Sequence, residues 1–274
     1  MAPLNLKRAT FAATALLAGL LSSAQAQNTP VDSWDVVLSG PQRGLMQITF
    51  VADFTLNGFE IITQKPRSAH ASDDADVRTP DGSDSRGGAD NGSSLITSIY
   101  GGASLDGTWT YDNRGRVIGV INEVGETGTN AISFTATVRP GSRINMVGHR
   151  DGRRITYRGV PVAALADFSG NYYSNGTRGG KPFTELYTLT PGTDPNTYDI
   201  VGTGPNYGLA GTLLVSGQKR VALYTATTET TNGLIRSVTG SFNLTTGSGN
   251  VLGLSQDPAG GGQAVNVKAS VIKQ

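Results

Sequence analysis

Cysteine is absent from this 274-residue sequence, and histidine (2 residues), tryptophan (2) and methionine (3) are scarce. Without cysteine there is no disulfide framework, no thiolate metal site and no cysteine nucleophile. The two histidines, His70 and His149, have no second histidine at ligand spacing, and we expect both to be solvated rather than catalytic. The stability of the fold must therefore come from an apolar core.

Long hydrophobic runs are also missing after residue 26, and residues 1–26 themselves read as a bacterial secretory signal peptide. Lys7 and Arg8 precede a mostly apolar segment at 9–21, and 24–26 (AQA) is a small-x-small cleavage site. That segment is short for a membrane-spanning helix, and a retained anchor is the alternative. We expect cleavage near Ala26 and a mature protein that is secreted or periplasmic, without a transmembrane span.

An excess of charge of one sign is likewise missing. The sequence holds 22 basic and 21 acidic residues, and removal of Lys7 and Arg8 leaves 20 basic residues and a net charge of −1. Such a chain lacks the general basic character of nucleic-acid-binding proteins, so we expect no nucleic-acid partner.

The sequence does contain an internal repeat. Three pairs of segments match in the same order: 34–45 (WDVVLSGPQRGL) with 198–209 (YDIVGTGPNYGL), 107–120 with 240–254, and 132–138 with 265–271. Ordered matches indicate a duplicated structural unit. Asp35 and Asp199 are equivalent in the first pair. We expect them to bond backbone N–H groups near the Gly-Pro turn, with paired carboxylate sites as the alternative.

Strand signals extend along the whole chain beyond residue 26. Apolar residues alternate with polar ones in segments such as 132–138, and the 37 glycines supply tight turns, as at Asn57-Gly58. Each half offers eight candidate strands. The first half includes one near 94–100, and the segment Arg143–Arg158, which divides at Asp151-Gly152, completes its unit.

These observations predict an all-β protein of two tandem, homologous antiparallel meander units, each barrel-like with about eight strands. Closure into a small barrel removes exposed strand edges. The alternative is one continuous β-sandwich or one larger barrel. The first unit is predicted at 27–160, with an Asp-rich loop insertion at 65–93, and the second at 161–274.

Two regions of the first unit have no counterpart in the second. We expect the insertion to be a flexible surface loop. It contains Asp74, Asp76, Asp81 and Asp84, so a calcium site is an alternative, although the twelve-residue loop pattern with a terminal glutamate is absent, and a partner-binding loop is another. No other cofactor is expected. The segment 139–158 contains six arginines, and we expect a solvated hairpin that pairs partly with the Asp-rich insertion. The alternative is an anion site, because guanidinium groups suit phosphate or carboxylate ligands.

The predicted function is non-catalytic: an exported protein that binds a small amphipathic or anionic molecule, or an envelope partner, in a barrel interior or between the units. The candidate ligand-binding residues are Trp34, Trp109, Tyr198, Arg150 and Arg154. Core packing would explain the aromatic residues equally well. The alternatives are a structural or adhesive surface protein and a secreted hydrolase that uses two carboxylates, but no catalytic residue stands out.

Overall fold

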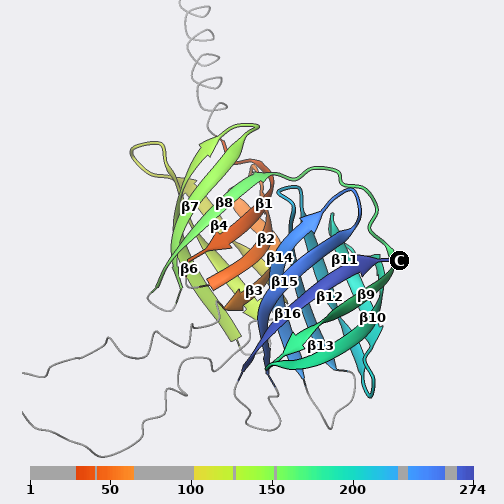
Figure 1. Ribbon diagram of the computed structural model, residues 1–274. Helices are drawn as coiled ribbons and strands as arrows, with labels where there is room; N and C mark the ends of the chain where they lie inside the picture. The colour runs from red at the N-terminus through yellow and green to blue at the C-terminus, as the bar shows by residue number, and fades with distance from the viewer. Residues whose placement is uncertain are drawn as a thin grey trace, which may run out of the picture.

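The computed structural model contains two closed antiparallel barrels of eight strands each, side by side in one chain (Figure 1). It describes residues 29–40, 42–64, 102–125, 128–150, 153–227, 234–256 and 264–274. The prediction of two tandem eight-stranded units is confirmed, and the alternative of a single sandwich or one larger barrel is wrong. The predicted signal peptide, the candidate strand near 94–100 and the insertion at 65–93 lie outside the described residues.

Barrel 1 is a simple meander in which each strand pairs with the next and β8 pairs with β1. Its strands are β1 (Asp32–Ser39), β2 (Gln42–Phe50), β3 (Thr55–Gln64), β4 (Gly102–Tyr111), β5 (Val117–Gly125), β6 (Gly128–Arg139), β7 (Arg143–Arg150) and β8 (Arg153–Pro161). The predicted completion of this unit by the arginine-rich segment corresponds to β7 and β8, which close the barrel.

Barrel 2 has the same up-and-down order, and β16 pairs with β9 to close it. Its strands are β9 (Gly170–Arg178), β10 (Lys181–Pro191), β11 (Thr197–Thr203), β12 (Gly208–Ser216), β13 (Arg220–Thr227), β14 (Ile235–Asn243), β15 (Ser248–Gln256) and β16 (Val265–Lys273). Among the described residues there is no apolar helix of membrane-spanning length.

The two barrels are related by a shift of two strands. The matched segments place β1–β6 of barrel 1 against β11–β16 of barrel 2. The remaining pair precedes the match in barrel 2, as β9–β10, and follows it in barrel 1, as β7–β8. A closed meander tolerates this change because the first and last strands are neighbours in space, so either end of the chain can supply the missing hairpin.

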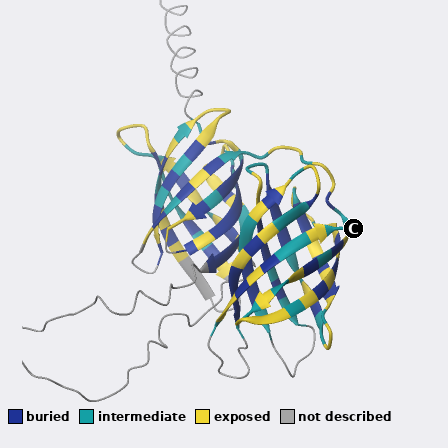
Figure 2. Ribbon diagram, viewed as in Figure 1, coloured by how far each residue is buried: buried dark blue, intermediate teal, exposed yellow. Residues whose placement is uncertain are grey.

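The core of each barrel follows from strand alternation, since successive side chains point to opposite faces of a strand (Figure 2). In β7, for example, Ile144 and Met146 are fully buried inside barrel 1, whereas Arg143 and His149 are exposed outside. The interior of barrel 1 is one apolar cluster that includes Trp34 and Trp109, and that of barrel 2 is another that includes Tyr198. Each barrel therefore has its own core.

The β1–β2 hairpin and its counterpart β11–β12 differ in length by one residue. Residues that match in sequence after this turn therefore point to opposite faces of the two barrels. Val36 pairs with Met46 in barrel 1, whereas its counterpart Ile200 pairs with Gly211, one residue further along. Leu45 and Leu209 match in sequence, but Leu45 lies outside barrel 1 and Leu209 lies inside barrel 2. A shift of one residue moves a side chain to the opposite face, so the aligned letters are not structural equivalents here.

A third apolar cluster joins the barrels. Leu45 and Ile61 from barrel 1 pack on Leu214 and Ala222 from barrel 2. Backbone-directed hydrogen bonds accompany this contact. Thr63 Oγ1 donates to the Ser237 carbonyl (2.9 Å), and Ser237 Oγ donates to the Ile62 carbonyl (2.5 Å). The interface is therefore packed and directional, which fixes one barrel on the other.

Asp35 belongs to this junction, whereas its repeat counterpart Asp199 is exposed. The Asp35 carboxylate accepts hydrogen bonds from the Gly217 backbone N–H (3.1 Å) of barrel 2 and from Gln47 Nε2 (3.1 Å). Burial raises the pKa of Asp35, and these two hydrogen bonds oppose that change. Gln218 Nε2 adds a bond to the Asp35 carbonyl at 2.9 Å.

Candidate functional site

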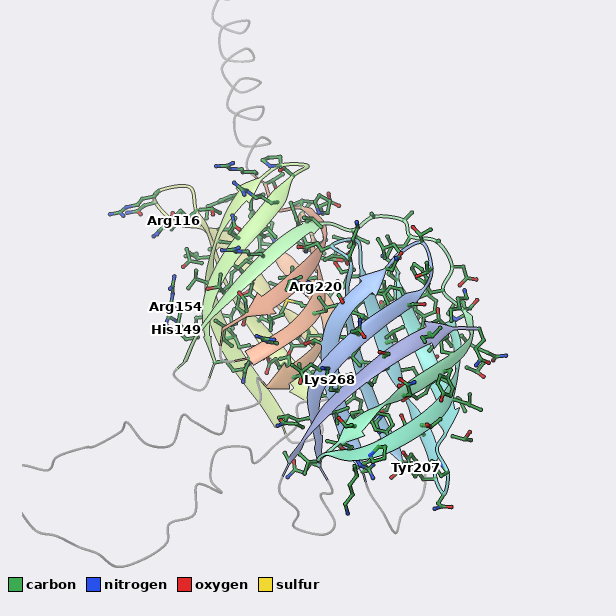
Figure 3. The ribbon with its side chains drawn as sticks, viewed as in Figure 1. Arg116, His149, Arg154, Tyr207, Arg220 and Lys268 are labelled. Carbon is green, nitrogen blue, oxygen red and sulfur yellow. The ribbon has the colours of Figure 1, made fainter. Side chains whose placement is uncertain are left out.

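The outer surface of β6, β7 and β8 carries basic side chains and no acid, because these three strands contain no aspartate or glutamate. We call it the arginine face. It consists of the exposed side chains Arg139, Arg143, His149, Arg154 and Arg158. In Figure 3, His149 and Arg154 lie together on the outside of barrel 1, and they are cross-strand partners on β7 and β8.

A surface groove of about 520 Å³ crosses this face. His149 and Arg154 line it together with Asn145 and the outward-facing hydroxyls of β6, such as Thr135. Arg116 also lines the groove, but its Nε is held by the Asp112 carboxylate at 2.7 Å. Hydroxyl, amide and guanidinium groups on one concave surface offer hydrogen bonds to oxygen-rich ligands and attraction to their negative charges.

The five arginine-face side chains form no hydrogen bond or ion pair with a described residue. Arg154 and Arg158 stand four residues apart on one strand, a separation of about 13 Å at the usual rise per residue. A chain with repeated anionic groups can contact both guanidinium groups and other basic side chains of the face at the same time.

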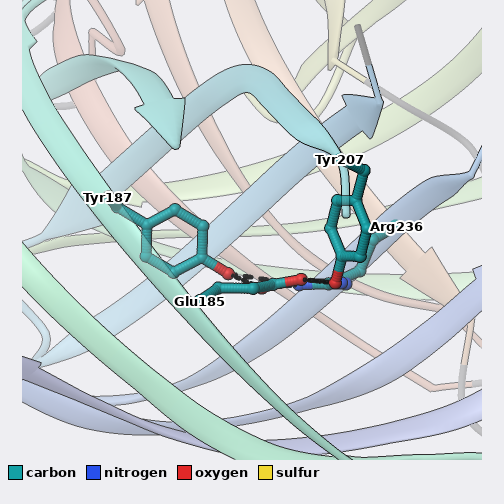
Figure 4. Close-up of polar contacts among 4 residues, drawn as sticks. All are labelled: Glu185, Tyr187, Tyr207 and Arg236. Atoms are coloured by element: carbon teal, nitrogen blue, oxygen red, sulfur yellow. Dashed lines mark hydrogen bonds and ion pairs between the residues drawn. The ribbon is translucent and has the colours of Figure 1, made fainter. Parts of the chain in front are cut away.

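Polar residues also gather inside barrel 2, around the buried Glu185 (Figure 4). Arg236 binds this carboxylate through both terminal nitrogens, at 2.6 and 2.7 Å. Tyr187 and Tyr207 donate their hydroxyls to it as well, the latter at 2.6 Å. Burial is the largest single influence and raises the pKa of Glu185, but Arg236 and the two tyrosine hydroxyls together outweigh it and hold the pKa below its usual range.

Barrel 1 has a buried cluster with a different charge balance. Arg150 NH2 binds Glu60 (2.9 Å) and also contacts Glu123, while its other terminal nitrogen donates to Gln42 Oε1 (3.0 Å). One guanidinium thus serves two carboxylates. Burial raises the pKa of Glu60 to about 7, although Arg150 opposes the rise. Burial also raises the pKa of Tyr157 to about 12, and its hydroxyl has no hydrogen-bond partner among the described residues.

Both clusters receive a side chain from the repeated Gly-Pro hairpin. Gln42 follows Gly40 in barrel 1, and Tyr207 follows Gly204 in barrel 2. A Cβ at Gly204 would lie 2.3 Å from the Tyr207 ring, so only glycine leaves room for this ring to reach Glu185. The repeated motif therefore positions a polar group at the same end of each barrel, where the odd-numbered strands finish.

These clusters do not provide an evident catalytic pair. Glu185 is saturated by four donors, and Glu60 and Glu123 share one arginine inside a core, so no described carboxylate pair flanks an open cleft. A narrow apolar cavity inside barrel 2, lined by Tyr172, Leu213 and other core residues, holds about 20 Å³, which is the volume of one water molecule.

The structure places the three candidate aromatic residues in the cores. Trp34 donates its indole N–H to the Pro30 carbonyl at 2.8 Å, and Trp109 donates to the Val51 and Thr55 carbonyls. Tyr198 accepts from the Phe168 backbone N–H at 3.1 Å. Their polar atoms are thus used within the protein, at the barrel ends opposite the ionic clusters.

The two candidate arginines point in opposite directions. Arg150 is buried inside barrel 1, whereas Arg154 is exposed on the arginine face. The five candidate ligand-binding residues therefore do not meet in one pocket. Asp74, Asp76, Asp81 and Asp84 lie outside the described residues, and the calcium site stays a prediction. Within the described ranges, no group of three His, Cys, Asp or Glu side chains is placed to hold a metal ion.

The ionic clusters were missed from sequence, although a signal was present. Glu185 stands in phase with Phe183, Tyr187 and Leu189, which form the apolar face of its strand. In the same way, Arg150 is in phase with Ile144 and Met146. A charged residue at an inward position predicts a buried partner, because an unpaired buried charge is strongly unfavourable.

Comparison with known proteins adds one distant similarity. No protein-family model matches the sequence, and no curated protein matches it significantly. A solved structure from Bacteroides fragilis, described as a "putative outer membrane protein", aligns over 66% of this chain and 92% of its own length. The identity is 10% and the TM-score is 0.28, which is too low to carry an argument about function.

Proposed function

We propose that this protein is an exported, non-catalytic binding protein whose arginine face holds an anionic polysaccharide of the cell envelope. The observation that carries the proposal is the acid-free outer surface of β6–β8. It combines five exposed basic side chains with a groove of about 520 Å³ that presents hydroxyl and amide groups. Arginine forks bind carboxylate and sulfate oxygens through paired hydrogen bonds, and the polar groove suits sugar hydroxyls.

A membrane surface is less well matched to this face. Surface-binding proteins combine basic residues with apolar side chains that enter the bilayer interface. Large exposed apolar residues occur elsewhere among the described residues, for example Phe54, Leu186 and Val201, and none of them lies on β6–β8. The predicted signal peptide is consistent with an envelope ligand, since it would bring the protein to that compartment.

Polygalacturonate binding by the mature protein is the direct test, with neutral dextran as the uncharged polymer. We expect saturable binding to polygalacturonate that weakens as salt is raised, because its main attraction is between charges. A triple variant, Arg143→Gln with Arg154→Gln and Arg158→Gln, should bind at least about tenfold more weakly, a change that corresponds to about 1.4 kcal/mol.

The matched control changes the same net charge elsewhere: Lys181→Gln with Lys268→Gln and Lys273→Gln. Lys181 and Lys268 are exposed and Lys273 is half-buried, and all three lie on β10 and β16 of barrel 2. The control variant should bind like the unmodified protein. Equal weakening of both variants would show nonspecific charge attraction and would overturn the proposal, as would preferential binding to anionic phospholipid vesicles.

A further inference from the structure

A second cationic site lies between the two barrels, next to the Arg158 end of the arginine face, since Arg158 pairs with Val37 across β8 and β1. A groove of about 310 Å³ runs along the junction. Barrel 1 contributes residues of β1 and β2 to its wall, including Val37, Ser39 and Arg43. Barrel 2 contributes residues of β13 and β14, including Arg220 and Thr239. We call it the junction groove. Its volume is within the range of small-molecule sites.

The shape of this groove is fixed by the packed interface beneath it. Leu45, which lines the groove, is also part of the apolar cluster that joins the barrels. The hydrogen bonds of Asp35 and Gln218 cross the same junction. A ligand would therefore meet a largely preformed site and would not have to order the walls, which lowers the free-energy cost of binding.

The charge of the junction groove is unbalanced. Arg43 and Arg220 come from different barrels, and both are exposed. Neither guanidinium forms a hydrogen bond or ion pair with a described residue, and the described residues that line the groove include no aspartate or glutamate. Figure 3 shows Arg220 near the line where the two barrels meet. Two like charges beside one cavity raise its electrostatic potential, which attracts an anion from solution.

We infer that the junction groove binds a small organic anion through a phosphate or carboxylate group held between Arg43 and Arg220. The Thr239 hydroxyl adds a hydrogen-bond donor at the rim, whereas the Ser39 hydroxyl donates to the Thr156 carbonyl (3.3 Å). Val37 and Leu45 provide an apolar wall for a short carbon skeleton. This groove is smaller than the one on the arginine face, and we assign a small anion to it instead of a polymer. Because the walls come from both barrels, the bound anion also holds them together.

Isothermal titration of the mature protein with inorganic phosphate and with citrate, at constant ionic strength set by chloride, tests this inference. We expect one saturable site for at least one of the two probes. Arg43→Gln and Arg220→Gln should each weaken binding at least tenfold, and the double variant should abolish it. Ser39→Glu should also abolish binding with both arginines in place, since it puts a negative charge at the rim.

All three positions are exposed, so their variants should keep the unfolding temperature of the unmodified protein in the absence of ligand. A double variant of the arginine face that leaves Arg158 in place, Arg143→Gln with Arg154→Gln, serves as the second control and should bind the probe normally. Loss of binding in that variant, undiminished binding in the Arg43 and Arg220 double variant, or no saturable binding of either probe would overturn the inference. None of these outcomes depends on the polysaccharide proposal, which is tested separately.

Discussion

The two barrels share a fold and a repeat, but they bury different amounts of charge. Barrel 2 holds one carboxylate, Glu185, against one guanidinium, Arg236, and two tyrosine hydroxyls complete the set of donors. Barrel 1 holds two carboxylates, Glu60 and Glu123, against one guanidinium. The two copies therefore retain the same strands and the same Gly-Pro hairpin, whereas their buried polar residues differ.

Both tryptophans lie in barrel 1, and this makes the comparison measurable. Trp34 and Trp109 are core residues of that barrel, and the sequence contains only 2 tryptophans. Tryptophan fluorescence therefore reports on barrel 1, while far-UV circular dichroism reports on both barrels. A change that destabilises one barrel should separate the two signals, which violates two-state unfolding in a recognisable way.

The largest expected effect is the loss of the guanidinium in barrel 2. Arg236→Met leaves Glu185 buried without its cation, and removal of one partner of a buried pair typically costs about 3–5 kcal/mol. In urea, the circular dichroism transition should move to lower concentration and split from the fluorescence transition. Arg178→Met on the same barrel should leave both transitions in place, and similar curves for the two variants would contradict the interpretation.

The second prediction uses pH, because the two clusters respond with opposite sign. Burial raises the pKa of Glu60 from 4.5 to about 7, so its stabilising contribution is complete below pH 4.5 and is lost as pH rises through 7. The pKa of Glu185 is lowered, so its contribution is present above pH 4.5 and is lost as pH falls. Barrel 1 should therefore lose stability between pH 4.5 and 7, while barrel 2 should not.

Fluorescence-detected unfolding at a series of pH values checks this sign. Glu123→Gln should reduce the loss in barrel 1, since Arg150 then serves one carboxylate and lowers the pKa of Glu60. A shift of the fluorescence transition to higher denaturant concentration between pH 5 and 7 would contradict the raised pKa of Glu60.

The fold could be predicted from sequence to a large extent. Strand alternation and Gly-containing turns located β9–β16 to within a few residues, and the repeat showed that β7–β8 had to complete the first unit. The sequence repeat did not reveal that the β11–β12 hairpin is one residue longer than the β1–β2 hairpin, because Gly44-Leu45 and Gly208-Leu209 are identical in the aligned sequences. Cross-strand pairing decides which side chains face inward, and it depends on contacts that no single segment encodes.

The candidate sites were harder to predict than the fold. The arginine-rich segment was recognised, but alternation divides it, so that Arg150 is inside and Arg154 outside. The junction groove was not foreseeable from local patterns, because Arg43 and Arg220 are far apart in the chain and meet only when the barrels pack. Sites between domains depend on tertiary geometry, whereas inward charges such as Glu185 leave a periodic signal.

The third prediction concerns two tyrosines at equivalent positions on the strands that pair with the first matched strand, Tyr157 on β8 beside β1 and Tyr187 on β10 beside β11. Tyr187 donates to Glu185 and accepts from Arg236, whereas Tyr157 has no hydrogen-bond partner among the described residues. Tyr187→Phe should cost about 1.5–3 kcal/mol, because its bond is to a charged group, and Tyr157→Phe should be neutral or stabilising. Thermal unfolding of the two variants gives the comparison directly, and equal losses would contradict it.

The smallest effect is expected at the matched aspartates, where one copy contacts the other barrel and one does not. Asp35→Ala removes the acceptor for the Gly217 N–H and for Gln47, which should cost about 1–3 kcal/mol. Asp199→Ala changes an exposed residue and should stay within about 0.5 kcal/mol of the unmodified protein. Because the lost contacts lie between the barrels, Asp35→Ala should also separate the fluorescence and circular dichroism transitions. A loss in Asp199→Ala as large as that in Asp35→Ala would mean that the repeated aspartate stabilises its own hairpin, and that the junction contributes nothing beyond it.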